Sequence, residues 1–260
     1  MGIDIGSVYS KGVITKENEL SVFHVILSGG NYRTAAERVR QELLKRVNLT
    51  QDDIANTVGA GCGAGNVYFA SHRASDIVCT ARGVNSMFPS ARVVIEVAGQ
   101  SSKVMRINKQ GLVANFVISE KCAAGSGWFI EVIANVLRID LEDFGPLSLK
   151  SKNPIAFSTG CAVFGESEAV TRVAEGIPKE DIAAGVNKAL ADKISSLTKK
   201  IGLEEPCVIS GGGALNIGLI KALEHGLNVQ LLVAPQPQIT AALGAALLAR
   251  MKVKGADLGK

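Results

Sequence analysis

The chain has 260 residues, of which 47% are hydrophobic and 20% are charged, and its formal net charge is +4. This length and hydrophobic content exclude a disordered chain and allow one large α/β unit or two modest lobes. The Lys and Arg residues are scattered, and only one Trp and three Tyr are present, which argues against a nucleic-acid-binding surface.

The apolar runs are all shorter than a membrane span, and no signal peptide is recognisable, so we expect a cytoplasmic protein with no membrane partner. The five cysteines are an odd number, which does not fit the disulfide framework of a small secreted domain. There is no Cys-x-x-Cys pair and the histidines are far apart. A zinc site within one chain is therefore not expected.

The chain begins with a predicted β-hairpin over residues 2–14, whose turn we place at the Asp-Ile-Gly-Ser segment of residues 4–7. Backbone N–H groups in such a small-residue turn can approach a phosphate closely, and Asp4 can hold a hydrated Mg²⁺ ion. Taken alone, the pattern also fits an ordinary hairpin.

A second segment repeats this pattern. Residues 3–11 align with residues 95–103 without a gap, which places Asp4 over Glu96 and Lys11 over Lys103, 92 residues apart. The duplication predicts two related lobes that face a cleft, and chance similarity between two common hairpins is the alternative.

The rest of the chain alternates between helical and strand-like segments. Helices are predicted over residues 32–47, 76–84, 128–137, 164–174, 181–201, 215–225 and 239–252. Strands are predicted over residues 57–64, running into a glycine-rich turn, and over residues 112–118, 155–158, 207–210 and 229–233, with a connector at 139–148. Cys79 is expected on a core face, whereas Cys62 lies in a glycine loop with no evident partner.

Cys122 and Cys161 each stand in a small-residue loop before a predicted helix. The helix dipole and the free backbone N–H groups at such a position favour a thiolate. A thiolate is the form that binds a soft metal. The alternative is that both side chains are buried small hydrophobic groups.

Three consecutive glycines, Gly211, Gly212 and Gly213, lie between a predicted strand and a predicted helix. This arrangement lets the backbone pass close to a flat or charged ligand, although a flexible turn is the alternative.

The two hairpins, the triple glycine, the segment K-C-A-A-G-S-G-W-F around Cys122 and the segment C-A-V-F-G-E-S-E from Cys161 resemble the activator (ATPase) family of 2-hydroxyacyl-CoA dehydratases. The ATPase subunits of benzoyl-CoA reductase belong to the same family. The resemblance extends from residue 2 to about residue 248. It implies an α/β fold with two ribonuclease-H-like lobes of the actin/Hsp70/sugar-kinase superfamily around a nucleotide cleft. We place the lobes at residues 1–90 and 91–260, with the helix at 239–252 able to pack back on the first lobe.

The same resemblance implies ATP or ADP and Mg²⁺ as ligands. It assigns catalytic roles to Asp4, Glu96 and Gln100, with Gln100 positioning a water. The implied nucleotide contacts lie on the two hairpin turns, the second of which includes Ala98, and on the triple glycine: Gly6, Ser7, Lys11, Gly99, Lys103, Gly211, Gly212 and Gly213.

Cys122 and Cys161 are, by resemblance, the two thiolates that each chain gives to one [4Fe–4S] cluster shared between two subunits. The partner is a second copy or a paralogous subunit. ATP hydrolysis is then expected to drive low-potential single-electron transfer to a CoA-ester dehydratase or reductase. Reduced ferredoxin or flavodoxin is the expected donor, in an anaerobic cytoplasm.

The second hairpin departs from the family pattern D-x-G-G-Q-D-x-K, because Glu96, Ala98 and Ser101 stand where Asp, Gly and Asp are usual. Ala98 adds a methyl group where the backbone approaches phosphate most closely. Trp128 stands where the activators typically carry Arg. Two alternatives stay open: a sugar or acyl kinase of the same superfamily, for which no clear second acid is found, and a non-hydrolysing, nucleotide-binding partner subunit.

Overall fold

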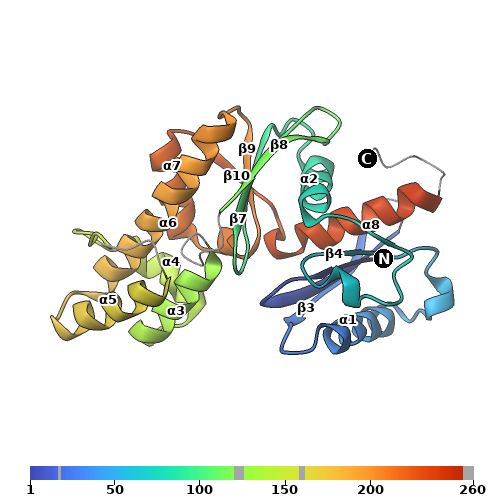
Figure 1. The fold of residues 1–260 in the computed structure, drawn as a ribbon, viewed down its shortest axis with the longest axis horizontal. Helices are drawn as coiled ribbons and strands as arrows, with labels where there is room; N and C mark the ends of the chain where they lie inside the picture. The colour runs from blue at the N-terminus through green and yellow to red at the C-terminus, as the bar shows by residue number, and fades with distance from the viewer. Residues whose placement is uncertain (17–18, 120–125, 158–161, 254–260) are drawn as a thin grey trace. The chain divides into compact units, whose positions relative to one another are not determined.

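The computed structural model describes residues 1–16, 19–119, 126–157 and 162–253 (Figure 1). The chain divides into two compact units. Unit 1 contains Met1–Ala91, Ile107–Ala114 and the chain from Ala234 onward, and unit 2 contains Arg92–Arg106 and Asn115–Val233. A mixed five-stranded sheet is the centre of each unit.

The sheet of unit 1 has the strand order β3-β2-β1-β4-β5. Its strands are β1 (Gly2–Ile5), β2 (Tyr9–Lys16), β3 (Glu19–Leu27), β4 (Val58–Ala60) and β5 (His72–Arg73). The pairs β1–β2 and β2–β3 are antiparallel, whereas β1–β4 and β4–β5 are parallel. The predicted hairpin is confirmed, but its turn begins at Gly6, because Asp4 and Ile5 still belong to β1. Strand β3 was not predicted from the sequence.

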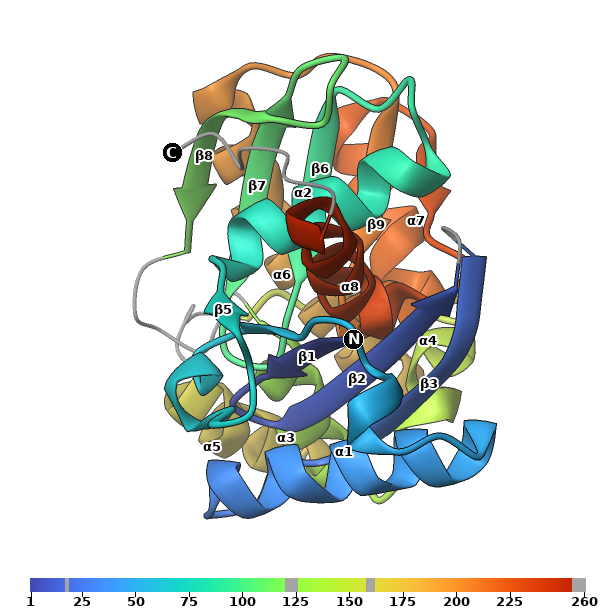
Figure 2. The same cartoon turned by 90° about the vertical axis from the view of Figure 1, so that its right-hand side faces the viewer.

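Helices cover both faces of this sheet (Figures 1 and 2). The helices of unit 1 are α1 (Tyr32–Val47), α2 (Asp76–Met87) and α8 (Thr240–Val253), with short 3₁₀ turns η1 (Gln51–Asp53), η2 (Ala64–Asn66) and η5 (Pro237–Ile239). Successive residues of a strand point to opposite faces, so Ile3 and Ile5 pack with α1, while Val13 packs with α8. A Cβ on Gly2 would collide with the carbonyl of Ala242, so α8 lies directly on the backbone of β1.

The sheet of unit 2 repeats this topology, with the strand order β8-β7-β6-β9-β10. Its strands are β6 (Val93–Val97), β7 (Ser102–Ile107), β8 (Val113–Ile118), β9 (Cys207–Ser210) and β10 (Leu231–Val233). As in unit 1, the first strand pairs antiparallel with the second and parallel with the fourth. The predicted duplication of the hairpin therefore extends to the whole sheet.

Five α-helices of unit 2 lie within the described residues: α3 (Gly127–Leu137), α4 (Leu141–Ser148), α5 (Ala162–Ala174), α6 (Lys179–Ile201) and α7 (Ile217–Leu227), together with the 3₁₀ turn η4 (Gly212–Leu215). The largest buried cluster of the unit joins the strands to these helices through fully buried side chains such as Ile95, Phe129 and Leu190.

Two predicted elements were wrong. The connector at 139–148 contains helix α4, in which Phe144 is fully buried, so its packing outweighs the helix-breaking tendency of Pro146. Residues 155–157 of the predicted strand at 155–158 form no strand, because the Ile155 N–H donates to the carbonyl of Asp181 at the start of α6; Ser158 lies outside the described residues. None of the described helices combines the length and the hydropathy that a membrane span needs.

Candidate functional site

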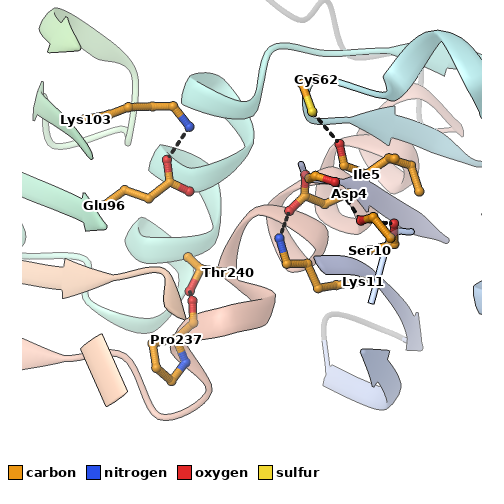
Figure 3. A network of polar contacts seen from close by, with 11 residues as sticks. Asp4, Ile5, Ser10, Lys11, Cys62, Glu96, Lys103, Pro237 and Thr240 are labelled. Carbon is orange, nitrogen blue, oxygen red and sulfur yellow. Dashed lines mark hydrogen bonds and ion pairs between the residues drawn. The ribbon is translucent and has the colours of Figure 1, made fainter. Parts of the chain in front are cut away.

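The first hairpin places an acid directly opposite a lysine (Figure 3). Asp4 and Lys11 are partners in the β1–β2 register, and Lys11 Nζ lies 3.0 Å from Asp4 Oδ2. Asp4 is only 6% exposed, at the carboxyl end of β1 where the chain turns. A buried carboxylate with a bound lysine beside it is suited to phosphate and Mg²⁺, because the two groups supply both signs of charge.

The turn of this hairpin is held by its own backbone and by two serines. The Gly6 N–H donates to the Tyr9 carbonyl at 3.0 Å, and the Ser28 hydroxyl donates to the Gly6 carbonyl at 2.6 Å. Ser10 and Ser28 are joined through their hydroxyls at 2.8 Å. A Cβ on Gly6 would lie 2.7 Å from the Tyr9 carbonyl oxygen, so a larger residue would force the turn open. Ser7 is half-buried in this turn.

The second hairpin repeats the arrangement with a longer acid. Glu96 and Lys103 are register partners in the β6–β7 pair, and Lys103 Nζ donates to Glu96 Oε2 at 2.8 Å. Both residues are 7% exposed. The predicted correspondence of Asp4 with Glu96 and of Lys11 with Lys103 therefore holds in the strand register as well as in the sequence.

The turn of the second hairpin spans Ala98 to Ser101 and is closed by a hydrogen bond of 2.9 Å from the Ala98 N–H to the Ser101 carbonyl. Gly99 is half-buried and Gln100 is exposed at the tip. The structure thus brings Glu96, Gly99, Gln100 and Lys103 together on one hairpin.

The triple glycine follows β9, which lies parallel to β6. Gly211 has φ +83°, and a Cβ there would collide with the Val97 carbonyl, while a Cβ on Gly213 would collide with Val97 Cγ1. A Cβ on Gly212 would meet no atom within 4 Å. Packing on β6 therefore explains two of the three glycines, and Gly212 is the one with open space for a ligand.

Unit 1 contains a counterpart of the triple glycine that was not predicted from the sequence. Gly61, at the end of β4, also has φ +83°, and a Cβ there would collide with Asp4 Oδ1 and the Ile5 carbonyl. A Cβ on Gly63 would collide with Ile5 Cγ2, as one on Gly213 would with Val97. Between them, Cys62 occupies the position of Gly212, and its Sγ donates to the Ile5 carbonyl at 3.4 Å (Figure 3). The alternation of glycines in the segment Gly-Ala-Gly-Cys-Gly was the available signal.

Cys122 and Cys161, the predicted metal ligands, lie outside the described residues. Among the described residues, no group of three or more His, Cys, Asp or Glu side chains is arranged to hold a metal ion. Cys79 and Cys207 are buried, as expected for Cys79, and Cys62 is exposed. Burial raises the pKa of Cys207 to about 11, with the charge of Glu205 adding to the effect.

The model of the BadF/BadG/BcrA/BcrD ATPase family matches residues 1–249 of the chain. A 2-hydroxyisocaproyl-CoA dehydratase activator from Clostridioides difficile is 39% identical over 249 residues, which cover 96% of this chain and 94% of that protein. An (R)-2-hydroxyglutaryl-CoA dehydratase activating ATPase from Acidaminococcus fermentans is 35% identical over 253 residues, which cover 97% of each.

Solved structures give the same relationship. The activator of the 2-hydroxyisocaproyl-CoA dehydratase from Clostridium difficile, with bound ADPNP, is similar with a TM-score of 0.92 and 37% identity over 100% of this chain and 98% of that chain. A ROK family glucokinase from Streptomyces griseus, at 13% identity and a TM-score of 0.61 over 96% of this chain and 98% of that chain, is similar in fold alone. The predicted actin/Hsp70/sugar-kinase fold class is confirmed.

Proposed function

Since the chain belongs to the BadF/BadG/BcrA/BcrD ATPase family, we propose that it hydrolyses ATP to drive low-potential single-electron transfer to a CoA-ester dehydratase or reductase. The observation that carries this proposal is the 39% identity to a 2-hydroxyacyl-CoA dehydratase activator over 96% of this chain. Similarity of that extent joins this chain to activators rather than to kinases, whose similarity concerns the fold alone.

We propose that the turns of both hairpins bind the phosphates of ATP, and that Gly211, Gly212 and Gly213 contact the adenosine side. ADPNP is bound to a relative with 37% identity, which supports a nucleotide as the ligand. In this chain, Lys11 and Lys103 each lie within hydrogen-bond distance of an acid on the opposite strand, so both ammonium groups are already positioned at the turns. A charged donor held in place in advance loses little conformational entropy when it binds phosphate.

The carboxylates of Asp4 and Glu96 are the proposed holders of Mg²⁺, which shields the phosphate charge during hydrolysis. Both are buried at the ends of first strands, and hard oxygen ligands are the ones that Mg²⁺ prefers. Gln100 is exposed at the tip of the second turn, and we propose that its amide orients the attacking water.

We propose Cys122 and Cys161 as the thiolate ligands of a [4Fe–4S] cluster shared by two subunits, either two copies of this chain or this chain and a paralog. The donor set supports this, because Cys79 and Cys207 are enclosed in packed cores, while Cys62 lies against the end of β1. Two thiolates from each of two chains supply the four that such a cluster needs. The cluster, when bound, supplies storage for one electron at low potential.

We propose two lobes at residues 1–90 and 91–260, and the division of the chain into two compact units supports two lobes. The compact units differ from these bounds, since unit 1 also includes Ile107–Ala114 and the chain from Ala234 onward, which contains α8. In this proposal, what the chain supplies to electron transfer is the arrangement of its two hairpin turns, which depends on the bound nucleotide. Reduced ferredoxin or flavodoxin is the source of the electron.

The proposal is tested by mixing the anaerobically purified chain with a reduced ferredoxin, Mg-ATP and an inactive 2-hydroxyacyl-CoA dehydratase. Dehydration that requires both ATP and the chain, and that stops when ADPNP replaces ATP, is the expected result. Phosphorylation of a sugar or an acyl acid without iron would overturn the proposal in favour of a kinase.

A second candidate, a non-hydrolysing partner subunit, is favoured by one observation. Ala98 stands where its counterpart in the first turn is Gly6, and we expect its added methyl group to hinder the close approach of phosphate to the backbone. A normal iron content without ATP turnover would support this candidate.

A further inference from the structure

The turn of the second hairpin is hydrogen-bonded to the start of helix α3 through main-chain groups. The Gly127 N–H donates to the Ala98 carbonyl and the Trp128 N–H donates to the Gly99 carbonyl, both at 2.9 Å. Backbone N–H groups at a helix start lack partners within the helix, and here the hairpin turn satisfies two of them. Ser126, the N-cap of α3, makes no side-chain capping hydrogen bond.

A second link joins the same turn to the end of strand β8. The Ser119 N–H donates to the Ser102 carbonyl at 2.8 Å, and the Ser102 N–H donates to the Ser119 hydroxyl at 2.9 Å. Ser119 is 5% exposed and Ser102 is fully buried, so both hydrogen bonds are shielded from water. Residues 120–125, which include Cys122 and lie outside the described residues, are therefore flanked on both sides by residues that are hydrogen-bonded to the second hairpin, either to its turn or to Ser102 at the start of β7.

The first hairpin has the same turn but a different arrangement at the helix that follows. Ser28, the counterpart of Ser119, bonds to the Gly6 carbonyl and to Ser10. Helix α1, however, begins on its own cap, because the Asn31 side chain accepts from the Thr34 N–H at 3.0 Å. A hairpin turn is therefore hydrogen-bonded to the start of the following helix in unit 2, whose sequence contains Cys122. In unit 1 the corresponding helix α1 is capped by Asn31.

The geometry of a peptide group also fixes where the N–H groups of this turn point. In a trans peptide the C=O and the N–H point in opposite directions. Because the carbonyls of Ala98 and Gly99 point at α3, the N–H groups of Gly99 and Gln100 point away from it. Both N–H groups belong to the turn that the proposed function assigns to phosphate.

We propose that the peptide groups 98–99 and 99–100 couple the nucleotide to the start of α3, with phosphate on their N–H side and helix α3 on their C=O side. Gly127 is the positioning residue of this link. This link rests on the proposed function, which supplies the nucleotide as the ligand of the turn. It adds the atoms through which nucleotide binding acts on helix α3. Hydrogen bonds in a chain polarise one another, so phosphate on the N–H side strengthens the bonds to Gly127 and Trp128.

The chain carries its own reporter at this point, because Trp128 is the only Trp and is 40% exposed. We therefore expect its fluorescence to change on titration of the full chain with Mg-ADPNP, with half of the change at the dissociation constant that calorimetry gives. Hydrogen exchange at the Gly127 and Trp128 amides should slow at least threefold in the same complex.

The decisive variant is Gly127→Pro, with Gly127→Ala as its matched control. Proline removes the N–H that Ala98 accepts, yet it is favoured at the first position of a helix, and the extended Ser126 (φ −144°, ψ 167°) suits the residue before proline. Alanine keeps the N–H, and its Cβ would lie 3.3 Å from the Ala98 oxygen.

We expect Gly127→Pro to bind Mg-ADPNP within about threefold of wild type but to lose at least four-fifths of the Trp128 response, while Gly127→Ala keeps it. A full response in Gly127→Pro would overturn the inference. So would nucleotide binding to the wild type without any change in Trp128 fluorescence or in exchange, a measurement that does not depend on the variant folding. Both results leave the proposed function standing, whereas a failure of calorimetry to detect nucleotide binding would overturn the proposed function as well.

Discussion

Lys103 lies opposite Glu96 across the β6–β7 pair, with 2.8 Å between Nζ and Oε2, in the same register in which Lys11 lies opposite Asp4. The two strand pairs belong to sheets with the same strand order. One local device, an acid and a lysine at the end of a first strand, is thus present twice in the chain.

Neutralising a turn lysine should weaken nucleotide binding. We expect Lys11→Gln to lower the affinity for Mg-ATP at least tenfold, a loss of about 1.4 kcal/mol, because an ammonium–phosphate hydrogen bond is replaced by a neutral one. Isothermal titration calorimetry measures this directly. Lys188→Gln is the matched control, since Lys188 pairs with Asp192 on the exposed face of α6, and unchanged binding is expected there. Equal losses in both variants would contradict the assignment of Lys11 to phosphate.

Gln100 should affect the hydrolysis step more than binding. An exposed amide that orients water acts on the reacting groups and not on the bound phosphates, so Gln100→Ala should lower kcat for ATP at least tenfold while KM changes less than threefold. Gln110→Ala changes the same residue type in the exposed turn before β8 and should leave both constants unchanged. A rise in KM with kcat retained would assign Gln100 to binding instead.

The three glycines should respond differently to alanine. Gly211 has φ +83° and ψ 173°, which side chains rarely adopt, and its Cβ would collide with the Val97 carbonyl, so Gly211→Ala should lower the free energy of unfolding by about 1–3 kcal/mol. Gly212→Ala should leave the melting temperature within about 2 °C, since a Cβ there meets no atom, but should weaken nucleotide binding. Thermal unfolding and calorimetry on the two variants separate these effects. A stable Gly211→Ala protein would show that the contact with Val97 yields easily.

Thiol chemistry should separate the described cysteines. At pH 8 we expect iodoacetamide to modify Cys62 at least tenfold faster than Cys79 or Cys207, because Cys62 is exposed and burial raises the pKa of Cys207 to about 11. Mass spectrometry of digested protein gives the rate at each site.

The raised pKa of Cys207 also sets a pH dependence of stability. The pKa of the Cys207 thiol is about 11 in the folded chain, compared with an ordinary value of 9.0. Between these pH values the folded state therefore binds more protons than the unfolded state. The contribution of this thiol to the free energy of unfolding is fully present below pH 9 and is lost as the pH rises towards 11. Denaturant unfolding of wild type and Cys207→Ala across this range should converge at high pH; a constant difference would contradict the shift.

The sequence was informative wherever a pattern was local. The spacing of Asp4 and Lys11 follows from a tight turn between two paired strands, and helix α1 follows from the helical periodicity of its apolar residues, so both were predictable. Helix α4 was missed because Pro146 reads as a helix breaker, while the buried environment of Phe144 is a tertiary property.

Contacts between distant segments left little in the sequence that names both partners, even where alternating glycines indicate close packing. Gly61 approaches Asp4 only because β4 pairs in parallel with β1, a pairing that no local motif encodes. The hydrogen bonds from Gly127 and Trp128 to the second turn are main-chain bonds, so the sequence shows little of them beyond a glycine before the helix.

The central claim is that two chains share one iron–sulfur cluster through Cys122 and Cys161. The most direct measurement is the iron content, together with the native mass, of the wild-type chain and of Cys122→Ser, Cys161→Ser and Cys62→Ser, all purified under strict exclusion of oxygen. The account predicts a brown dimer with about four irons in wild type and in Cys62→Ser, and a colourless protein in the other two variants. An iron-free wild-type protein, both when purified alone and when produced together with a paralogous subunit, would contradict it, as would full iron content in Cys122→Ser and Cys161→Ser.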